Sequence, residues 1–376
     1  MAQHDYVIDN STGANVRADI NNALLAISSN NSGSSAPSTN YASQFFANTT
    51  SSIMQLRNTA NNAHVNLFTL AGGPAFAVDG TINSVNIGKG ANSVNGNTAL
   101  GQNALDASVS GENNTAIGSS SLTNNTSGEA NTAVGMFSAL SNTTGSQNVA
   151  VGTFSLDANT EGSFNVAIGR GALSTNTTAS NNTAIGRNSL EANTTGTQNT
   201  AVGSLALDAN TTGLNCTAVG MSALSSNTTA NDNTAIGYNA LFSNTTAASN
   251  VAVGRSALFA NTTGTLNVAV GALSLDANTT ATENTAVGYA SLTANTTGGF
   301  NTAVGTASLL VNTTGGANTS IGVDALKNNT TASNNVAVGR SALLTNTTGT
   351  QNVAVGALAL DANTTANNNT ALGYNS

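Results

Sequence analysis

The sequence predicts an all-β protein, a parallel β-roll or β-solenoid rod of 17-residue coils, preceded by a small α+β N-terminal domain. Glycine recurs every 17 residues from Gly101 to Gly373, without an insertion or deletion, which gives sixteen full repeats and the start of another. Counting each glycine as the first place, leucine fills the fifth place of every full repeat except one, where Ala139 stands. Such a strict period is typical of a repeat architecture, because an extra residue would shift one coil out of line with its neighbours.

Each repeat is expected to form one coil, since a helix pair needs about 33 residues or more. The run at residues 131–134 alternates, which suits a short strand with Thr/Val and Val/Ile on one face and alanine on the other. We expect the alanine row, including Ala133, Ala150 and Ala167, to be a packing face between subunits, and the Leu and Val/Ile rows to fill the coil. The Asn-Thr-Thr-Gly run supplies turns, and its stacked side chains can bond from coil to coil. At about 4.8 Å per coil, the rod would be roughly 75–80 Å long.

Composition limits the classes of partner. Charged residues make up 6% of the chain and apolar residues 39%, with a net charge of -8. A pI near 4.4 argues against nucleic acid as a partner. The single cysteine, Cys216, stands where the other repeats have asparagine, and we expect it to be an inert substitution.

The residues before the rod divide into two segments. Residues 1–80 are expected to form the N-terminal domain, with a helix from about residue 13 to residue 30 and a β-meander of strands near 41–47, 53–58 and 63–70. Residues 81–100 are expected to be irregular transition coils, and residues 101–376 the shaft.

The helix carries an apolar seam at spacings of four, three and four residues, formed by Val16, Ile20, Ala23 and Ile27. A helix of that length needs a partner. Two alternatives remain: a bundle of three such helices from three chains, or packing on the strands that follow.

No residue pattern indicates an enzyme, and no catalytic residue, metal site or cofactor is expected. His4 and His64 lie outside the repeats, and there is no phosphate-binding loop. Aspartates recur at the sixth place, and we expect them to form a solvated row: Asp106, Asp157, Asp208, Asp276 and Asp361. The second place varies most, and its Arg and Tyr side chains are the candidates for weak receptor contact: Arg170, Arg187, Tyr238, Arg255, Tyr289 and Arg340.

The runs Asn-Thr-Ala-Val-Gly and Asn-Val-Ala-Ile-Gly, as at residues 165–169, resemble the head repeat of YadA-like trimeric adhesins. Asn83-Ser84-Val85-Asn86-Ile87-Gly88 is closest to the form found in that family. The resemblance covers roughly residues 81–376, although the period is longer here. It implies a parallel β-roll and a homotrimer of chains packed side by side.

The N-terminal pattern resembles the opening of tail-fibre proteins from phages of cyanobacteria. It comprises Ala2-Gln3-His4-Asp5-Tyr6, then Asn10-Ser11-Thr12-Gly13 and the helical segment at residues 17–24, with a further match at Leu56-Arg57-Asn58. This resemblance implies a structural fibre of the virion, made in the host cytoplasm. Residues 1–80 would dock on a tail or adaptor protein, and the shaft would reach a glycan or protein on the host surface.

Two other functions stay open. The first is a cellular trimeric surface adhesin, disfavoured because no secretory signal, membrane span or membrane insertion is expected. The second is an ice-binding solenoid using its threonines, disfavoured because the threonines of Asn-Thr-Thr are adjacent and point in different directions.

Overall fold

The computed structural model describes residues 13–28, 34–35, 45–58, 60, 63–69, 80–82, 85–108 and 110–376. The chain divides into two compact units, Met1–Gly80 and Thr81–Ser376, and each is described by itself. The expectations for residues 1–12, including the tail-fibre resemblance at residues 2–6 and 10–12, fall outside the described residues.

The first unit contains helix α1 (Gly13–Ser28) and the strands β1 (Phe45–Asn48), β2 (Ile53–Arg57) and β3 (His64–Thr69). The strands pair antiparallel in the order β1-β2-β3. On α1, Val16 is half-buried, whereas Ile20 is 41% exposed and Leu24 is 59% exposed. The side chains of Ala23 and Ile27, the other seam residues, lie outside the described part of the chain. The seam residue Ile20 and the neighbouring Leu24, which is not part of the seam, therefore leave apolar surface open on the helix.

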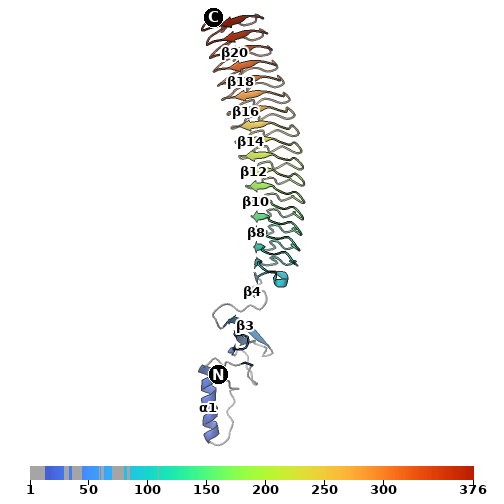
Figure 1. Cartoon of the computed structure of the whole chain (residues 1–376), viewed down its shortest axis with the longest axis vertical. Helices are drawn as coiled ribbons and strands as arrows, with labels where there is room; N and C mark the ends of the chain where they lie inside the picture. The colour runs from blue at the N-terminus through green and yellow to red at the C-terminus, as the bar shows by residue number, and fades with distance from the viewer. Residues whose placement is uncertain are drawn as a thin grey trace. The chain divides into compact units, whose positions relative to one another are not determined.

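The second unit is a β-solenoid in which each coil contributes one short strand (Figure 1). From β6 onward every strand pairs in parallel with the next one in the sequence, and equivalent residues of adjacent coils face each other, as in Ala167 opposite Ala184. The predicted parallel β-solenoid with a 17-residue coil is confirmed. The strands are β4 (Gly80–Ile82), β5 (Val85–Gly88), β6 (Thr98–Gly101), β7 (Thr115–Ile117), β8 (Thr132–Val134), β9 (Val149–Val151), β10 (Val166–Ile168), β11 (Thr183–Ile185), β12 (Thr200–Val202), β13 (Thr217–Val219), β14 (Thr234–Ile236), β15 (Val251–Val253), β16 (Val268–Val270), β17 (Thr285–Val287), β18 (Thr302–Val304), β19 (Thr319–Ile321), β20 (Val336–Val338), β21 (Val353–Val355) and β22 (Thr370–Leu372).

The solenoid begins irregularly. Strand β5 pairs antiparallel with β6, and a short 3-10 turn, η1 (Ala91–Ser93), lies between them. Parallel stacking starts only at the pair β6 and β7. Regular stacking therefore begins with the strand that ends at Gly101, the first glycine of the 17-residue series.

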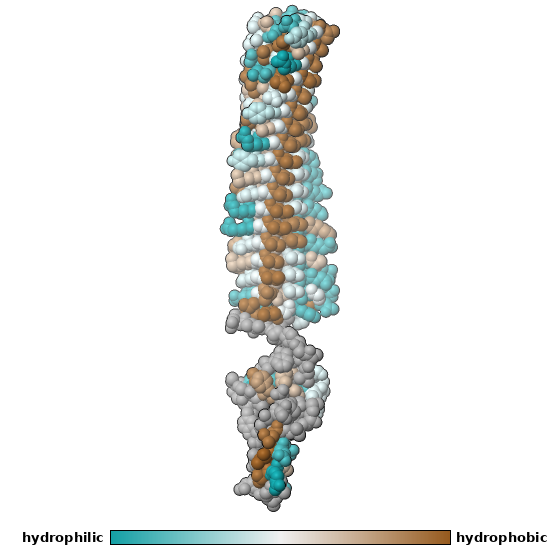
Figure 2. All heavy atoms as spheres, turned by 90° about the vertical axis from the view of Figure 1, so that its left-hand side faces the viewer, coloured by the Kyte–Doolittle hydropathy of each residue, from teal (hydrophilic) through white to brown (hydrophobic). Residues whose placement is uncertain are grey.

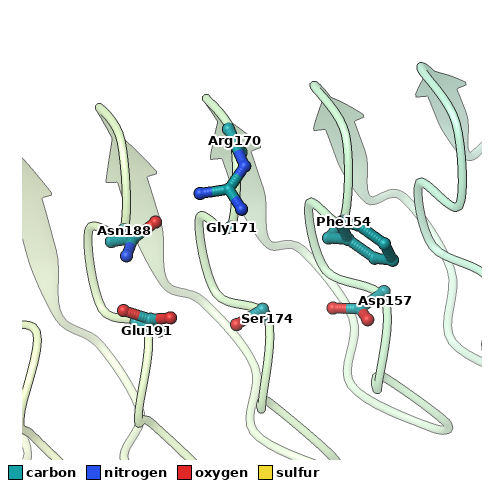
Figure 3. Close-up of a pocket in the computed structure, with 7 residues that line it drawn as sticks. All are labelled: Phe154, Asp157, Arg170, Gly171, Ser174, Asn188 and Glu191. Atoms are coloured by element: carbon teal, nitrogen blue, oxygen red, sulfur yellow. The ribbon is translucent and has the colours of Figure 1, made fainter.

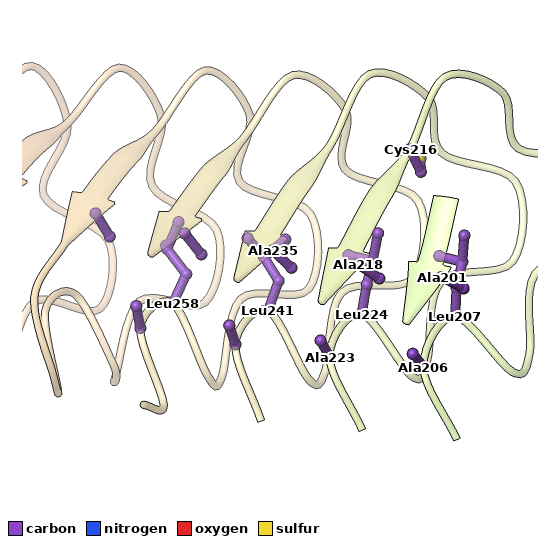
Figure 4. Packing of buried hydrophobic residues seen from close by; sticks show 14 of the residues in the cluster. Ala201, Ala206, Leu207, Cys216, Ala218, Ala223, Leu224, Ala235, Leu241 and Leu258 are labelled. Carbon is purple, nitrogen blue, oxygen red and sulfur yellow. The ribbon is translucent and has the colours of Figure 1, made fainter. Parts of the chain in front are cut away.

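The interior of each coil is narrow and is filled by leucine and alanine (Figure 4). The fifth-place leucines, such as Leu207 and Leu224, are fully buried, as predicted. Alanine at the sixteenth place is fully buried too, as at Ala201 and Ala218. Side chains alternate along a strand, so the Thr/Val and Val/Ile places must point outward.

The expected assignment of the two strand faces is therefore wrong. Ala133, Ala150 and Ala167 are 0% exposed within a single chain, which leaves them no surface to offer to another subunit. The Val/Ile row lies on the outside and does not fill the coil. The physical reason is space: Leu from the opposite wall already fills most of the interior, and the strand contributes only small side chains beside it, alanine or, at Ser320, serine.

Two ladders of buried asparagine join the coils. At the eighth place, Asn142 Nδ2 donates to Asn125 Oδ1 of the preceding coil at 2.8 Å and to the Gly145 carbonyl at 2.9 Å. At the fourteenth place, the Asn131 backbone N–H donates to Asn114 Oδ1 at 2.9 Å, while Asn131 Nδ2 donates to the Gly145 carbonyl at 2.9 Å. Each amide is thus paired inside a core where an unpaired one would cost about 1–3 kcal/mol.

The first-place glycine is required both by its backbone angle and by close packing. Gly152 has φ +133, and a Cβ added there would lie 2.6 Å from the carbonyl oxygen of Gly169 in the next coil. Residues other than glycine rarely adopt this backbone conformation, and Cβ atoms do not approach a carbonyl oxygen so closely. The recurring glycine therefore marks the point where adjacent backbones come closest.

Cys216 interrupts the ladder at the fourteenth place. Its backbone N–H still donates to Asn199 Oδ1 at 2.9 Å, and its Sγ approaches the Ala230 carbonyl at 3.3 Å. However, the N–H of Asn233 faces a sulfur atom where other coils offer an amide oxygen, and sulfur is the weaker acceptor. Burial raises the pKa of the Cys216 thiol to about 11, so the group stays protonated at neutral pH.

Replacing Cys216 by asparagine should therefore stabilise the solenoid. We expect Cys216→Asn to raise the free energy of unfolding by about 1 kcal/mol, because it restores a buried amide hydrogen bond. Urea unfolding followed by far-UV circular dichroism measures the change. The reciprocal control, Asn250→Cys, should lower stability, and a Cys216→Asn protein less stable than the original would contradict this account of the ladder.

Candidate functional site

The described residues hold no group of three or more His, Cys, Asp or Glu side chains that could bind a metal ion. Among them, no helix combines the length and apolar character that crossing a bilayer requires. Along the solenoid, equivalent residues of successive coils are aligned into rows of side chains.

The outer face of the strands carries an aliphatic stripe, which we define as the side chains at the fifteenth and seventeenth places (Figure 2). The fifteenth place holds Thr or Val and the seventeenth Val, Ile or Leu, and none of these residues between Thr115 and Leu372 is charged. Isoleucines at the seventeenth place are 37–40% exposed: Ile117, Ile168, Ile185, Ile236 and Ile321. The seventeenth-place row is aliphatic in every coil, and exposed apolar surface that is continuous in this way is typical of interaction surfaces.

The sixth-place aspartates do not form the uniform solvated row that the sequence predicts. Asp106 is exposed, but Asp157, Asp208 and Asp276 are half-buried, and this burial raises the pKa of each carboxyl group. Asp208 accepts a hydrogen bond from Ser225 Oγ at 2.7 Å. In contrast, Asp157 and Asp276 each have a buried Oδ1 without a partner. Two carboxylates thus keep an unused acceptor atom below the surface.

The second-place residues predicted as receptor contacts are all exposed, and each directly follows the glycine of its coil: Arg170, Arg187, Tyr238, Arg255, Tyr289 and Arg340. The solenoid aligns them along one edge without bringing them into a single cluster. Of the six, Arg170 also lines a hollow in the surface.

We call this feature the Gly171 hollow, a surface cavity of about 230 Å³ that spans three adjacent coils (Figure 3). The coil before Gly171 contributes Phe154 and Asp157, and the coil after it contributes Asn188 and Glu191. Gly171, Ser174 and Arg170 come from the central coil. Aromatic, acidic, basic and amide groups therefore meet around one small opening.

Sequence reasoning found Arg170 but missed the rest of the hollow. Its members lie 17 residues apart, at the third and sixth places of successive coils, so they become neighbours only when the coils are aligned. The signal available in the sequence was a glycine at a third place between coils that carry Phe154 and Asn188 there.

No protein-family model, curated protein or solved structure matches this chain significantly.

Proposed function

We propose that this chain is the subunit of a homotrimeric phage tail fibre. In this proposal residues 1–80 attach the fibre to a tail or adaptor protein, and the solenoid is a stiff shaft that reaches the host surface for adsorption. The proposal rests on the resemblances given above together with one observation of the fold. That observation is an uninterrupted stack of parallel coils, from β6 to β22, with an uncharged aliphatic stripe along its outer strand face.

The stack supports the role of a spacer. Every coil is joined to the next by backbone hydrogen bonds on the strand and by buried asparagine amides, so bending must distort many bonds at once. A stiff shaft holds binding groups at a fixed distance. If three chains act together, three weak contacts gain avidity, since the second and third form at high effective concentration.

The stripe supports association of identical chains. Its side chains recur at the axial spacing between adjacent coils. A second copy of this chain has the same spacing, so the two stripes can contact each other in register over their whole length. The absence of charge at the stripe allows it to be buried without an unpaired ion. The proposal of three chains, in particular, rests on the resemblance to YadA-like trimeric adhesins.

The ice-binding alternative is weakened by the strand pattern. An ice-binding face requires threonine at two outward places of each strand. Here the strands offer threonine at most at the fifteenth place, as in Thr132, with Val134 at the other outward place. Several strands, such as β15, carry valine at both.

Association through the stripe can be tested by adding charge. Lysine at Ile236, Val253 and Val270 together should prevent assembly, because three cations would have to be buried between chains. Sedimentation equilibrium should give three times the 37.0 kDa chain mass for the original protein and a single chain mass for the triple variant. The matched control places lysine at the exposed Thr246, Thr263 and Thr280 in the same region and should leave the trimer intact. A monomeric original protein, or equal behaviour of the two variants, would contradict this interface.

The location of the protein tests the function itself. Gold-labelled antibodies against the shaft, viewed by electron microscopy, should decorate projections on the tails of purified virions, and antibodies against residues 1–80 should label nearer the particle. Labelling of uninfected cells in place of virions would favour the cellular adhesin and overturn the fibre proposal.

A further inference from the structure

The Gly171 hollow exists because two small residues coincide in one coil. The third place has positive φ in all three coils, and it holds Phe154 in the preceding coil and Asn188 in the following one. In the central coil it holds Gly171, which has φ +68 and no side chain. At the sixth place, Ser174 stands between Asp157 and Glu191. The missing side chain and the short one leave the cavity of about 230 Å³ between taller neighbours.

One wall of the hollow is a fixed aromatic ring. Phe154 stacks on Phe137 of the preceding coil, with ring centroids 5.2 Å apart and planes inclined by 28°. Phe154 nevertheless remains 37% exposed. A ring held from behind in this way offers a flat apolar surface to a ligand at little cost in conformational entropy.

Below the ring lies the carboxylate of Asp157, and Figure 3 shows Arg170, Asn188 and Glu191 around the same opening. The carboxylate of Asp157 lines the hollow and supplies a hydrogen-bond acceptor there, although its Oδ1 atom is itself buried and without a hydrogen-bond partner. Asn188 offers both a donor and an acceptor, and Arg170 offers donors only. With two carboxylates and one guanidinium, the formal charge of the lining is negative.

We propose that the Gly171 hollow binds one ring of a neutral sugar, a pyranose of the hexose class. The C–H face of the ring would pack on Phe154. Sugar hydroxyl groups would donate to the carboxylates of Asp157 and Glu191 and accept from Arg170 or Asn188. The cavity has room for a single ring, and the net negative lining disfavours acidic sugars. This inference deepens the proposed function, on which it rests, by naming the class of receptor group that the side of the shaft recognises.

The position of the hollow makes a matched set of variants available. Gly171→Asn fills the cavity with the residue that the next coil has at the same place, and it displaces only the flexible end of Asn188, whose Oδ1 would lie 2.8 Å from the new Cβ. Phe154→Ser removes the ring and gives this place the residue found at Ser222. Asp157→Asn removes the carboxylate. The controls introduce asparagine at the equivalent places of coils outside the hollow: Ser256→Asn at the third place and Asp106→Asn at the sixth.

Saturation-transfer NMR of the full chain with free glucose, galactose, mannose and N-acetylglucosamine is the test, with dissociation constants taken from titration. We expect at least one of these sugars to bind, and Gly171→Asn and Phe154→Ser to abolish the transfer signal. Asp157→Asn should weaken binding about tenfold or more, the effect of losing a charged hydrogen-bond acceptor. Both control variants should bind as the original protein does, and circular dichroism of every variant establishes that it is folded.

The proposal is overturned if none of the four sugars gives a signal, or if folded Gly171→Asn and Phe154→Ser bind as well as the controls do. Preferential binding of N-acetylneuraminic acid would overturn the neutral class. If this test fails but the protein is a trimer and labels virion tails, the sugar-site proposal alone is rejected and the fibre proposal stands. If the protein binds sugar but is absent from virions, the fibre proposal is rejected instead.

Discussion

The structure depends on the pairing of identical groups from one coil to the next. Each buried asparagine amide accepts from or donates to the equivalent residue of a neighbouring coil, as Asn142 does with Asn125 and Asn159. A coil longer or shorter by one residue would place some other group opposite these amides and leave them unpaired in the core. This requirement explains why the 17-residue period has no exception from Gly101 onward. One departure from the pattern is compensated: Ser320 replaces a buried alanine and its hydroxyl accepts a hydrogen bond from Ser308. Another, Cys216, leaves the N–H of Asn233 with the weaker sulfur acceptor.

The narrow interior then decides what the surface offers. Because only small side chains are found beside the buried leucine, the larger aliphatic residues of each strand face outward, and stacking aligns them into a stripe. The same stacking aligns variable residues, and the Gly171 hollow arises where a coil with two small residues lies between larger neighbours. The surface proposed for self-association and the hollow proposed for ligand binding thus lie at different places of each coil, so each can vary without disturbing the core.

Much of the fold could be predicted from the sequence, because period and alternation are properties of a single coil. Which face of each strand points inward could not be predicted, because alternation alone is compatible with either orientation. The choice depends on the opposite wall of the coil, where the buried Leu224 packs beside the small side chain of Ala218. The left-handed backbone of the fifth-place leucines, as at Leu156 with φ 53, could not be predicted either, because leucine seldom adopts it. In the stack the Leu156 N–H donates to the Ala172 carbonyl of the next coil at 2.9 Å, and the side chain is fully buried. The stripe and the hollow could not be predicted from one repeat, because both are formed by residues of several adjacent coils.

The central claim, that coils stack in strict register, is tested most directly by two deletions that differ by one residue. Removing residues 271–287 takes out one whole coil and brings Gly288 directly after Val270, whereas removing residues 271–286 leaves one residue too many. Thermal unfolding followed by circular dichroism compares the two proteins. The account predicts that the 17-residue deletion keeps the β-sheet spectrum and a melting temperature close to that of the full chain. The 16-residue deletion should be destabilised by several degrees or more, because buried amides lose their partners. Equal stability of the two proteins would contradict the account.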